Sequence, residues 1–308
     1  RQNNPKAFIA LLIGRVESQA LKGCPYVDEM IIYDRKGKDR SLMRFFELAK
    51  EIKGYGFEEV VDLQHNSRSH LFAFLSSAPD RYGYKKGKYW FLLNRTISDL
   101  KYAIAPVEHQ FRVLAMLGIE KPSHDLELWP SADDEEAARR LLDGEWVGEN
   151  QVLVGINPGA SPKWATKKWS PENFAKVCDA LALEEIRTVL VGSAAEAETG
   201  IEILKLTKSK PINLIGKTSL TELAALMKRF KCLVTSDSAP MHIAAAMKTP
   251  FVALFGPTGP MRHLPPAEKY AVITKDLRCA PCYKPVCSDT RCMREITVAE
   301  VLKAVREI

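Results

Sequence analysis

Hydrophobic residues in this chain gather in short continuous runs that alternate with longer stretches of helical periodicity. In the first half, runs of strand length lie at 8–14, 29–34 and 58–64. Apolar residues at helical spacing lie at 41–53, 67–76 and 107–117. Strands that alternate with helices in this way predict a parallel sheet with helices on both faces.

The second half repeats this alternation more regularly. Its apolar runs lie at 152–157, 188–192, 212–216, 232–237, 251–256 and 271–274. Three helices have start signals, because Ser170 precedes a proline, and Ser219 and Thr297 each precede a glutamate at capping-box spacing. We therefore expect an α/β protein made of two doubly wound, Rossmann-like domains.

The charged segment at 130–151 contains no core strand and separates the two halves. We place the first domain at 1–145, the second at 146–295 and a final helix at 296–308. Two doubly wound domains that face each other line a cleft with the carboxyl ends of their strands. The first seven residues resemble the end of a helix and a turn, so we expect that an initial strand and helix precede this sequence.

The composition is that of an ordinary globular protein. Hydrophobic residues make up 46% and charged residues 27% of the 308 positions, and no stretch is apolar for long enough to span a bilayer. Without a secretion signal, a cytoplasmic setting is expected. The net charge of +6 favours anionic partners such as nucleotide phosphates, lipid headgroups or nucleic acid, and basic residues cluster at 81–88 and 163–168.

The polar residues with the clearest chemical pattern lie at a joint between two buried strands. A strand that ends at Asp237 and Ser238 is followed by a helix that opens at Ala239 and carries His242 in its first turn. Backbone N–H groups and the helix dipole make such a joint a binding site for an anion. An N-cap alone would explain one polar residue, but not an aspartate, a serine and a histidine together.

Two further loops of the second domain leave the same edge of the predicted sheet. The loop at 157–174 contains small residues with Ser161 and Lys167, which fits a phosphate site but also an ordinary loop with solubilising lysines. Glu196 follows the next strand, where a carboxylate either accepts hydrogen bonds from ribose hydroxyls or interacts with a helix dipole.

In the first domain, polar residues gather where the strand at 58–64 ends. Gln64, His65, Asn66 and Arg68 lie in this segment, and we expect them to face the cleft on the side of an acceptor. A polar loop between strand and helix is the competing interpretation.

Four of the seven cysteines are clustered near the C-terminus. Cys279, Cys282, Cys287 and Cys292 have the spacing C-x2-C-x4-C-x4-C, which fits a zinc knuckle or a compact loop of reduced thiols. The chain contains neither G-x-G-x-x-G nor G-x4-G-K-[ST], which disfavours nicotinamide enzymes and P-loop nucleotidases.

Three segments match the motifs of one family. SDSAPMHIAAA with the later PFVALFGPT resembles a diphosphate motif for nucleotide sugars, and NPGAS with the later Lys167-Lys168-Trp169 resembles a phosphate-binding loop. CAPCYKPVCSDTRCM resembles a cysteine-rich segment, and VDLQHNSRS and RYGY resemble an acceptor-domain pattern more loosely. By these motifs the chain resembles glycosyltransferase family 9, the bacterial ADP-heptose:lipopolysaccharide heptosyltransferases, and most of all heptosyltransferase II.

This resemblance implies a GT-B fold and inverting transfer of heptose from ADP-heptose to a lipid A–core oligosaccharide, without a metal ion or another cofactor. It implies a protein at the cytoplasmic face of the inner membrane that does not bind nucleic acid, and a last helix that crosses back to the first domain. The donor site implied by the family comprises Lys167 and Ser161 for phosphate, Glu196 for sugar hydroxyls, and Asp237, Ser238, Ala239 and His242 for diphosphate and heptose.

The chain departs from the family pattern in two places. Ala239 stands where the family often has glycine, which keeps a backbone donor but narrows the space around it. The family's Gly-Asp turn, whose aspartate is the candidate general base, would precede residue 1. We therefore assign no base, and expect weak donor binding and slow turnover from this chain.

Three alternatives stay open on the sequence alone. The chain could be a family relative that uses another nucleotide sugar, or a protein that binds a sugar nucleotide without catalysis. In a different class, the cysteine cluster and the basic patches could belong to a zinc-knuckle protein that binds nucleic acid, which would contain stoichiometric zinc and bind RNA or DNA with a steep salt dependence.

Overall fold

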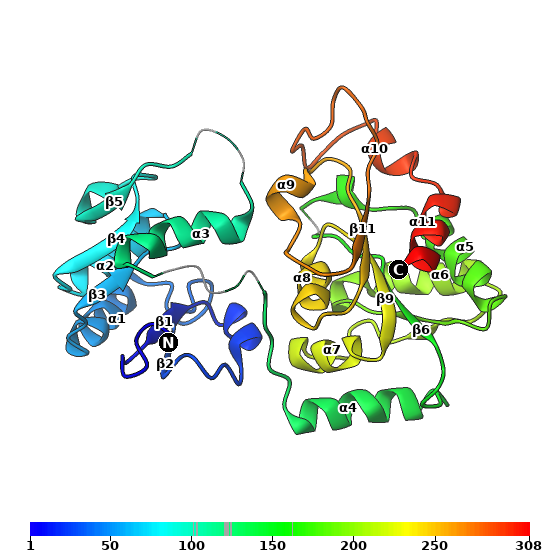
Figure 1. Cartoon of the computed structure of the whole chain (residues 1–308), viewed down its shortest axis with the longest axis horizontal. Coiled ribbons are helices and arrows are strands. Elements are labelled where there is room, and N and C mark those ends of the chain that lie inside the picture. Colours follow the sequence, from blue (N-terminus) through cyan, green and yellow to red (C-terminus); the bar gives the residue numbers. More distant parts are fainter. Residues whose placement is uncertain (101, 103, 120–122, 124, 162) are drawn as a thin grey trace. The chain divides into compact units, whose positions relative to one another are not determined.

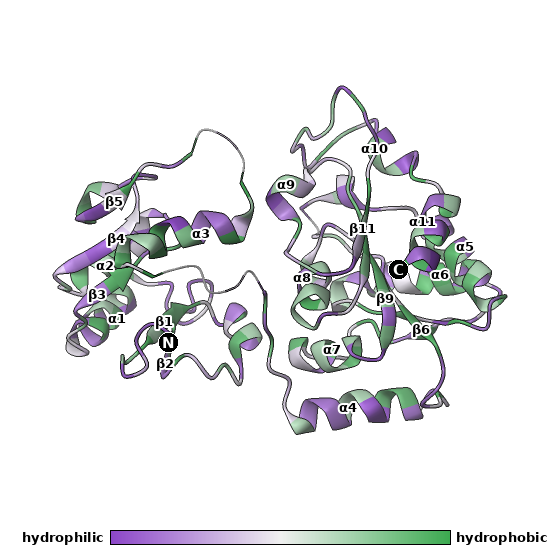
Figure 2. Cartoon of the chain, in the orientation of Figure 1, coloured by the Kyte–Doolittle hydropathy of each residue, from purple (hydrophilic) through white to green (hydrophobic). Residues whose placement is uncertain are grey.

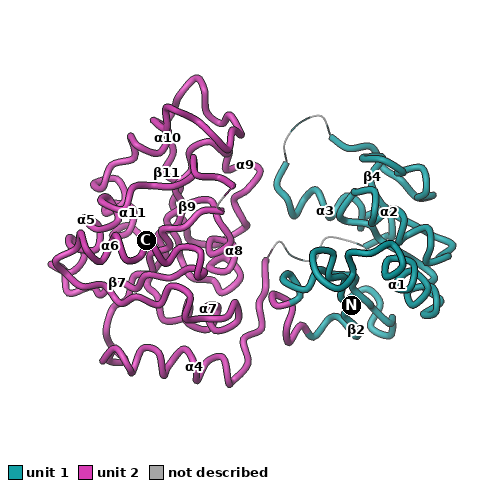
Figure 3. Tube along the Cα trace, turned by 180° about the vertical axis from the view of Figure 1, so that it is seen from behind, with its two compact units in different colours: residues 1–18, 25–124 teal, residues 19–24, 125–308 magenta. Residues whose placement is uncertain are grey.

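The computed structural model describes residues 1–100, 102, 104–119, 123, 125–161 and 163–308. The chain divides into two compact units, which Figure 3 shows in different colours. Unit 1 comprises residues 1–18 and 25–124, and unit 2 comprises residues 19–24 and 125–308. Each unit has hydrophobic core clusters of its own.

Unit 1 contains two parallel sheets (Figure 1). Strand β1 (Ala10–Ile13) pairs with β2 (Glu29–Ile32), and β3 (Glu59–Val61), β4 (Asp80–Tyr84) and β5 (Arg95–Ile97) pair in that order. The helices of unit 1 are α1 (Leu42–Gly54), α2 (Ser67–Leu75) and α3 (Pro106–Leu114), with 3-10 helices η2 (Trp90–Leu92) and η3 (Ala115–Leu117). The 3-10 helix η1 (Glu17–Leu21) begins in unit 1 and ends in unit 2.

Helix α1 forms because its apolar residues recur every three or four positions and Ser41 caps it. The Ser41 hydroxyl accepts a hydrogen bond from the Arg44 N–H at 3.2 Å. The buried stripe packs with Ile31 of β2 and Phe72 of α2 into one core. Its members are Phe45, Leu48, Ala49 and Ile52.

Strands β4 and β5 have no counterpart among the apolar runs of the sequence. Strand β4 has the sequence DRYGY, which does not read as apolar, although the rings of Tyr82 and Tyr84 are buried. Its start coincides with the basic cluster at 81–88, so half of that cluster is a strand and not a solvated face. Strand β5 has three residues, and Arg95 pairs across the sheet with Asp80 at 2.8 Å.

Unit 2 is built on one parallel sheet with the strand order β11-β10-β9-β6-β7-β8. The strands are β6 (Leu153–Asn157), β7 (Arg187–Leu190), β8 (Ile212–Asn213), β9 (Phe230–Ser236), β10 (Phe251–Leu254) and β11 (Tyr270–Ile273). Each coincides with an apolar run read from the sequence. Figure 2 shows β6 and β9 largely in the hydrophobic colour, whereas α4 alternates between the two colours along its length.

Helices cover both faces of this sheet. They are α4 (Ala132–Asp143), α5 (Pro171–Ala182), α6 (Ala197–Leu206), α7 (Leu220–Met227), α8 (Ala239–Ala246), α9 (Pro260–His263), α10 (Arg291–Arg294) and α11 (Val298–Glu307), with 3-10 helices η4 (Ala165–Lys167) and η5 (Ala194–Glu196). One core cluster contains buried residues of α4, α7 and α8, and the other contains those of α5, α6 and α11. Strand residues alternate between the two clusters, which is why the strands read as continuous apolar runs.

The helix starts expected from the sequence are present. The Ser170 hydroxyl accepts from the Asn173 N–H at 3.3 Å, directly before the first-turn proline of α5. Ser219 and Thr297 each form a capping box with the glutamate three residues later. These local signals fix where α5, α7 and α11 begin.

The boundary between the units lies earlier than the expected 145/146, because α4 belongs to unit 2. Ala138 and Leu142 of α4 are buried in the same cluster as α7, and Asp134 accepts a hydrogen bond from the Thr221 hydroxyl at 2.8 Å. The charged face of α4 concealed this buried stripe in the sequence.

The last helix packs on the sheet of unit 2. The expectation that 296–308 crosses back to the first domain stays a prediction. Its buried residues, among them Val301 and Val305, share a core with α5 and β10. An amphipathic helix buries its apolar side against an exposed apolar face of a sheet, and α11 does so on the sheet of its own unit.

Trp169 provides a test of how this core supports the loop that precedes it. The side chain is 1% exposed, its indole N–H donates to the Ile296 carbonyl at 3.0 Å, and its ring packs edge-on against Phe174. We expect Trp169→Ala to lower the free energy of unfolding by about 3–5 kcal/mol, measured by urea denaturation. Trp146→Ala, at a side chain that is 92% exposed, is the control and should cost less than about 0.5 kcal/mol. Equal losses in the two variants would contradict this account.

Candidate functional site

The strand order of unit 2 creates a switch point between β6 and β9. The chain runs from β6 outward to β7 and β8, and then returns to the other side of β6 with β9 and β10. Ligands of open α/β sheets bind at such a point, beyond the carboxyl ends of the strands. The loops expected to bind phosphate follow β6 and β9 directly, so both lie at this switch point.

Asn157, the last residue of β6, links the ends of neighbouring strands. Its side-chain N–H donates to the Val191 carbonyl, just beyond β7, at 2.9 Å. Its Oδ1 accepts from the hydroxyls of Thr235 at 3.2 Å and Ser238 at 3.0 Å. Asn157 is 2% exposed, so water does not compete for these bonds. The three loop starts are therefore held in one arrangement.

Glu196 lies against the loop that leaves β6. Its carboxylate accepts from the Ser193 hydroxyl at 2.7 Å. A Cβ atom on Gly159 would lie 2.4 Å from the Glu196 side chain, so only glycine permits this approach. Ser161 follows in the same loop and is exposed, and its carbonyl accepts from the Trp164 N–H at 2.7 Å. The structure thus brings Glu196 and the loop at 157–174 together.

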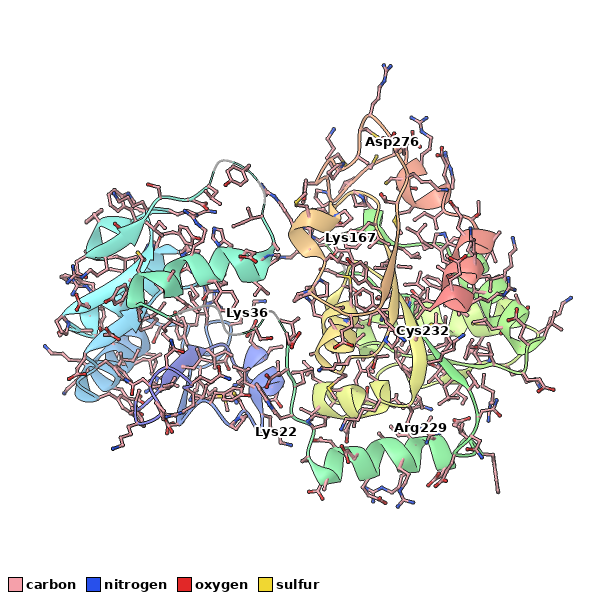
Figure 4. All side chains as sticks on the ribbon, viewed as in Figure 1. Lys22, Lys36, Lys167, Arg229, Cys232 and Asp276 are labelled. Atoms are coloured by element: carbon pink, nitrogen blue, oxygen red, sulfur yellow. The ribbon has the colours of Figure 1, made fainter. Side chains whose placement is uncertain are left out.

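Lys167 and Asp237 form an ion pair at the centre of the site. The Lys167 Nζ lies 2.7 Å from the Asp237 Oδ2, and the side chains are 12% and 6% exposed. The Thr258 hydroxyl donates to the same carboxylate oxygen at 2.7 Å. The Lys167 ammonium also lies 4.8 Å from the centre of the Trp164 ring. Figure 4 labels Lys167 within unit 2.

This ion pair gives Asp237 a role other than direct contact with an anion. A carboxylate repels a phosphate, and the Oδ2 of Asp237 already accepts from Lys167 and Thr258. Removal of one partner from so buried a pair leaves the other charge uncompensated. Asp237 therefore holds the ammonium and the hydroxyl in place, and the ammonium can exchange this partner for an anionic ligand.

Helix α8 begins at Ala239 without a side-chain cap. Ser238 occupies the N-cap position, but its hydroxyl donates to Asn157 and makes no bond to a backbone N–H of the helix. Ala239 is exposed, as is His242 in the first turn. Because no side chain caps this helix, its positive end is suited to an anionic ligand.

Two imidazoles accompany this helix start. Desolvation lowers the pKa of His242. The charge of the Asp237 carboxylate acts in the opposite direction and raises this pKa, whereas His263 of α9 lowers it further. Desolvation likewise lowers the pKa of His263, opposed by Asp237 and reinforced by Lys167. Both rings are therefore neutral at pH 7 and act as hydrogen-bonding groups without a charge.

Three residues of this site have no role in the sequence prediction, namely Asn157, Thr258 and His263. Asn157 and Thr258 lie inside segments from which the donor site is predicted, and each is the polar residue nearest the carboxyl end of a buried strand. This position in the sequence could have identified both as candidate site residues. For His263, whose Nε2 is buried without a hydrogen-bond partner in the described part of the chain, no sequence signal exists.

In unit 1, two of the residues expected on the acceptor side have structural partners. Asn66 caps α2, because its Oδ1 accepts from the backbone N–H groups of Arg68 at 2.9 Å and Ser69 at 3.1 Å. The Arg68 guanidinium donates to the Tyr33 hydroxyl. Gln64 is exposed in the middle of the same loop.

His65 differs from these neighbours. Its backbone φ is 55°, in the left-handed region, and its backbone N–H donates to the Asp62 carboxylate at 3.0 Å. Its ring packs edge-on against Tyr84, and both ring nitrogens are buried without a hydrogen-bond partner among the described residues. Desolvation lowers the pKa of His65, with Asp62 opposing it. A strained residue with an unpartnered, neutral ring is a candidate for function.

The cysteine-rich segment contacts the loop that carries Lys167 and the loop that carries Thr258. The Lys284 carbonyl accepts from the Thr166 hydroxyl at 2.9 Å, next to Lys167. The Tyr283 N–H donates to the Pro257 carbonyl at 2.8 Å, and its hydroxyl accepts from the Gly259 N–H at 3.3 Å. The cysteines are free thiols, and the described residues contain no group of three His, Cys, Asp or Glu side chains placed to hold a metal ion. The segment holds the loops of Lys167 and Thr258 in position.

Sequence relatives point to one family. A model of glycosyltransferase family 9 (heptosyltransferase) matches residues 45–292. Lipopolysaccharide heptosyltransferase 2 of Salmonella typhimurium is 31% identical over 220 residues, which is 68% of this chain and 63% of that relative. The chain thus spans less than two thirds of that relative's length.

Solved structures share the fold. A glycosyl transferase family 9 protein from Veillonella parvula has a TM-score of 0.86 at 24% identity, and the match covers 98% of this chain and 88% of that one. An E. coli heptosyltransferase solved with ADP-2-deoxy-2-fluoro heptose has a TM-score of 0.72 at 17% identity, with 99% and 91% covered. The α/β class with parallel sheets, expected from the sequence, is confirmed. Because the family model spans most of its length, this chain belongs to glycosyltransferase family 9, the heptosyltransferases.

Proposed function

We propose that this protein transfers a heptose from ADP-heptose to the inner core of lipopolysaccharide, with inversion at the anomeric carbon. The observation that carries the proposal is the Lys167–Asp237 ion pair at the switch point of unit 2, beside a helix start that no side chain caps. A diphosphate needs a cation, hydroxyl donors and backbone N–H groups in one place, and this site supplies all three.

The donor is bound by unit 2. Lys167, Ser161 and the N–H groups at Ala239 contact the diphosphate, and Ser238, fixed by Asn157, lies beside it. Glu196 accepts hydrogen bonds from sugar hydroxyls, and neutral His242 donates to phosphate or to heptose. The relative solved with ADP-2-deoxy-2-fluoro heptose binds a nucleotide of this type, which supports ADP-heptose as the donor.

The chemistry follows from charge. An acceptor hydroxyl attacks the anomeric carbon from the face opposite the diphosphate, the bond to the diphosphate oxygen breaks, and negative charge grows on the leaving ADP. Lys167 and the fixed N–H donors stabilise that charge without reorganisation. A general base removes the hydroxyl proton. We assign that base to no described residue.

The acceptor is a lipid A–core oligosaccharide, and we assign its binding to the end of β3. Gln64 is exposed there and is suited to polyol hydroxyls, and His65, whose ring nitrogens are buried, would have to turn its ring to reach them. Asn66 and Arg68 shape the loop through their own partners. We propose peripheral contact with the cytoplasmic face of the inner membrane. Among the described residues, the helices are all too short or too polar to cross a bilayer.

Calorimetry with different donors tests the proposed substrate. ADP-heptose should bind more tightly than UDP- or GDP-sugars, and addition of lipid A–core acceptor should yield a product with one more heptose, detected by mass spectrometry. Tighter binding of another nucleotide sugar would favour the alternative that the chain is a family member with a different donor. Donor binding without transfer to any acceptor would favour a noncatalytic binding protein.

Lys167 and Asp237 are tested together. Lys167→Ala removes the cation that stabilises the leaving group, and Asp237→Ala releases that cation from its position. Each variant should lower the transfer rate at least tenfold, which is about 1.4 kcal/mol of transition-state stabilisation. Lys168→Ala is the matched control, because Lys168 is exposed on the same loop. Near-normal rates in both variants would refute the site.

Asn157→Ala tests the linkage of the strand ends. The hydroxyls of Thr235 and Ser238 lose their shared acceptor, so we expect ADP to bind at least about tenfold more weakly by calorimetry. Asn150→Ala, at an exposed position in the same unit, should bind ADP normally. Thermal unfolding of both variants separates a local effect from global loss of structure, and unchanged ADP affinity in Asn157→Ala would argue against the linkage.

A further inference from the structure

Helix α1 presents three large apolar side chains to solvent in its first turns. Leu42, Met43 and Phe46 are 75%, 69% and 59% exposed. These three side chains are not part of the core of unit 1, because the buried residues of α1 lie on another face of the helix. Single exposed apolar residues are ordinary, but three within one and a half turns form a patch that calls for an occupant.

The segment that leads into α1 is positively charged. Arg35, Lys36, Lys38 and Arg40 are all exposed in the loop between β2 and α1, and Figure 4 labels Lys36. Of the two aspartates in this loop, Asp39 is 2% exposed and accepts from the Asp34 N–H at 2.7 Å, and Asp34 pairs with Arg15 at 2.9 Å. The exposed charges of residues 35–40 are therefore the four basic side chains.

Further cations continue the apolar side of the helix. Lys50 lies four residues after Phe46, and Lys53 lies three residues after Lys50, so both lie along the same side of α1 as Phe46, and both are exposed. We name the exposed residues of segment 35–46 the α1 tip. Apolar side chains flanked by lysine and arginine are the composition of segments that lie in a membrane interface.

We propose that the α1 tip docks this protein onto a bilayer of anionic phospholipid. Leu42, Met43 and Phe46 enter the boundary between headgroups and acyl chains, while the four cations of the loop remain with the phosphates. The inference builds on the proposed lipid-linked acceptor, since an enzyme held at the bilayer meets such an acceptor in two dimensions.

The other basic segment of unit 1 is less suited to this role. Lys86 is paired with Asp99 at 2.6 Å. Lys85 and Lys88 lie over the rings of Trp90 at 5.9 Å and Tyr89 at 4.9 Å. These contacts hold the cations of 85–88 against their own unit, whereas the described contacts of the α1 tip include no ion pair at Lys36 or Lys38.

Vesicle co-sedimentation tests the proposal with the whole chain. The chain should bind phosphatidylcholine vesicles that contain phosphatidylglycerol more strongly than vesicles of phosphatidylcholine alone. The triple variant Leu42→Ser, Met43→Ser, Phe46→Ser and the double variant Lys36→Glu, Lys38→Glu should each lose at least about tenfold in partitioning. The triple variant Lys85→Ala, Lys86→Ala, Lys88→Ala should lose less than either.

Two controls make this test decisive. Leu183→Ser removes a side chain that is 89% exposed in unit 2 and should not alter vesicle binding. The variant Leu42→Val, Met43→Leu, Phe46→Leu keeps the patch apolar and should bind like the original chain, so a loss in the serine variant alone reports polarity. Thermal unfolding should be unchanged in all variants, because the altered side chains are exposed.

The overturning results are specific. The proposal fails if the original chain binds no anionic vesicle, or if the serine variant binds as well as the original. It also fails if the serine variant changes only self-association in analytical ultracentrifugation, which would make the α1 tip an interface between copies of this chain. Because the vesicles contain neither donor nor acceptor, these results are independent of whether the chain transfers heptose.

Discussion

The side-chain amide of Asn157 is the constraint on which the functional unit depends. A parallel sheet by itself aligns strand ends, but it leaves the following loops free to adopt different paths. One buried amide that donates to Val191 and accepts from Thr235 and Ser238 removes that freedom. It also occupies the Ser238 hydroxyl, so that the start of α8 is left without a cap. The helix start that lacks a side-chain cap, and is therefore suited to an anion, is thus a consequence of how the strands are joined.

Much of unit 2 can be read from the sequence because local and global preferences agree there. Strands that are buried on both faces give continuous apolar runs, and Ser170, Ser219 and Thr297 mark helix starts within one residue. Unit 1 is harder to read. Strand β4 contains two buried tyrosines, but its sequence does not read as apolar. Helix α4 is mostly charged, so the sequence does not reveal that its few buried residues pack in unit 2. In neither case does the local pattern show which tertiary partner buries these residues.

The candidate site could be located from the sequence, but the roles of its residues could not. Asp, Ser and His after β9 identify the place, since they share one strand end. That Asp237 bonds to Lys167, seventy positions earlier in the chain, depends on a contact between two loops. Asn66 serves as a helix cap, and the ring nitrogens of His65 have no hydrogen-bond partner among the described residues, because of the geometry of one turn. Spacing predicts which residues meet at an edge, whereas partner choice is decided by packing.

The Lys167–Asp237 pair has a consequence for the whole cycle of binding and release. Because the Lys167 ammonium has the Asp237 carboxylate as an internal counterion, neither charge of the pair is buried without a partner. Under the function we propose, an entering diphosphate replaces Asp237 as the partner of Lys167, so the net gain in affinity is smaller than for an unpaired lysine. In that cycle the exchange runs backward after transfer, and Asp237 regains the ammonium as the nucleoside diphosphate departs. Asp237 would then compete with the product for Lys167 and limit how long the product remains bound.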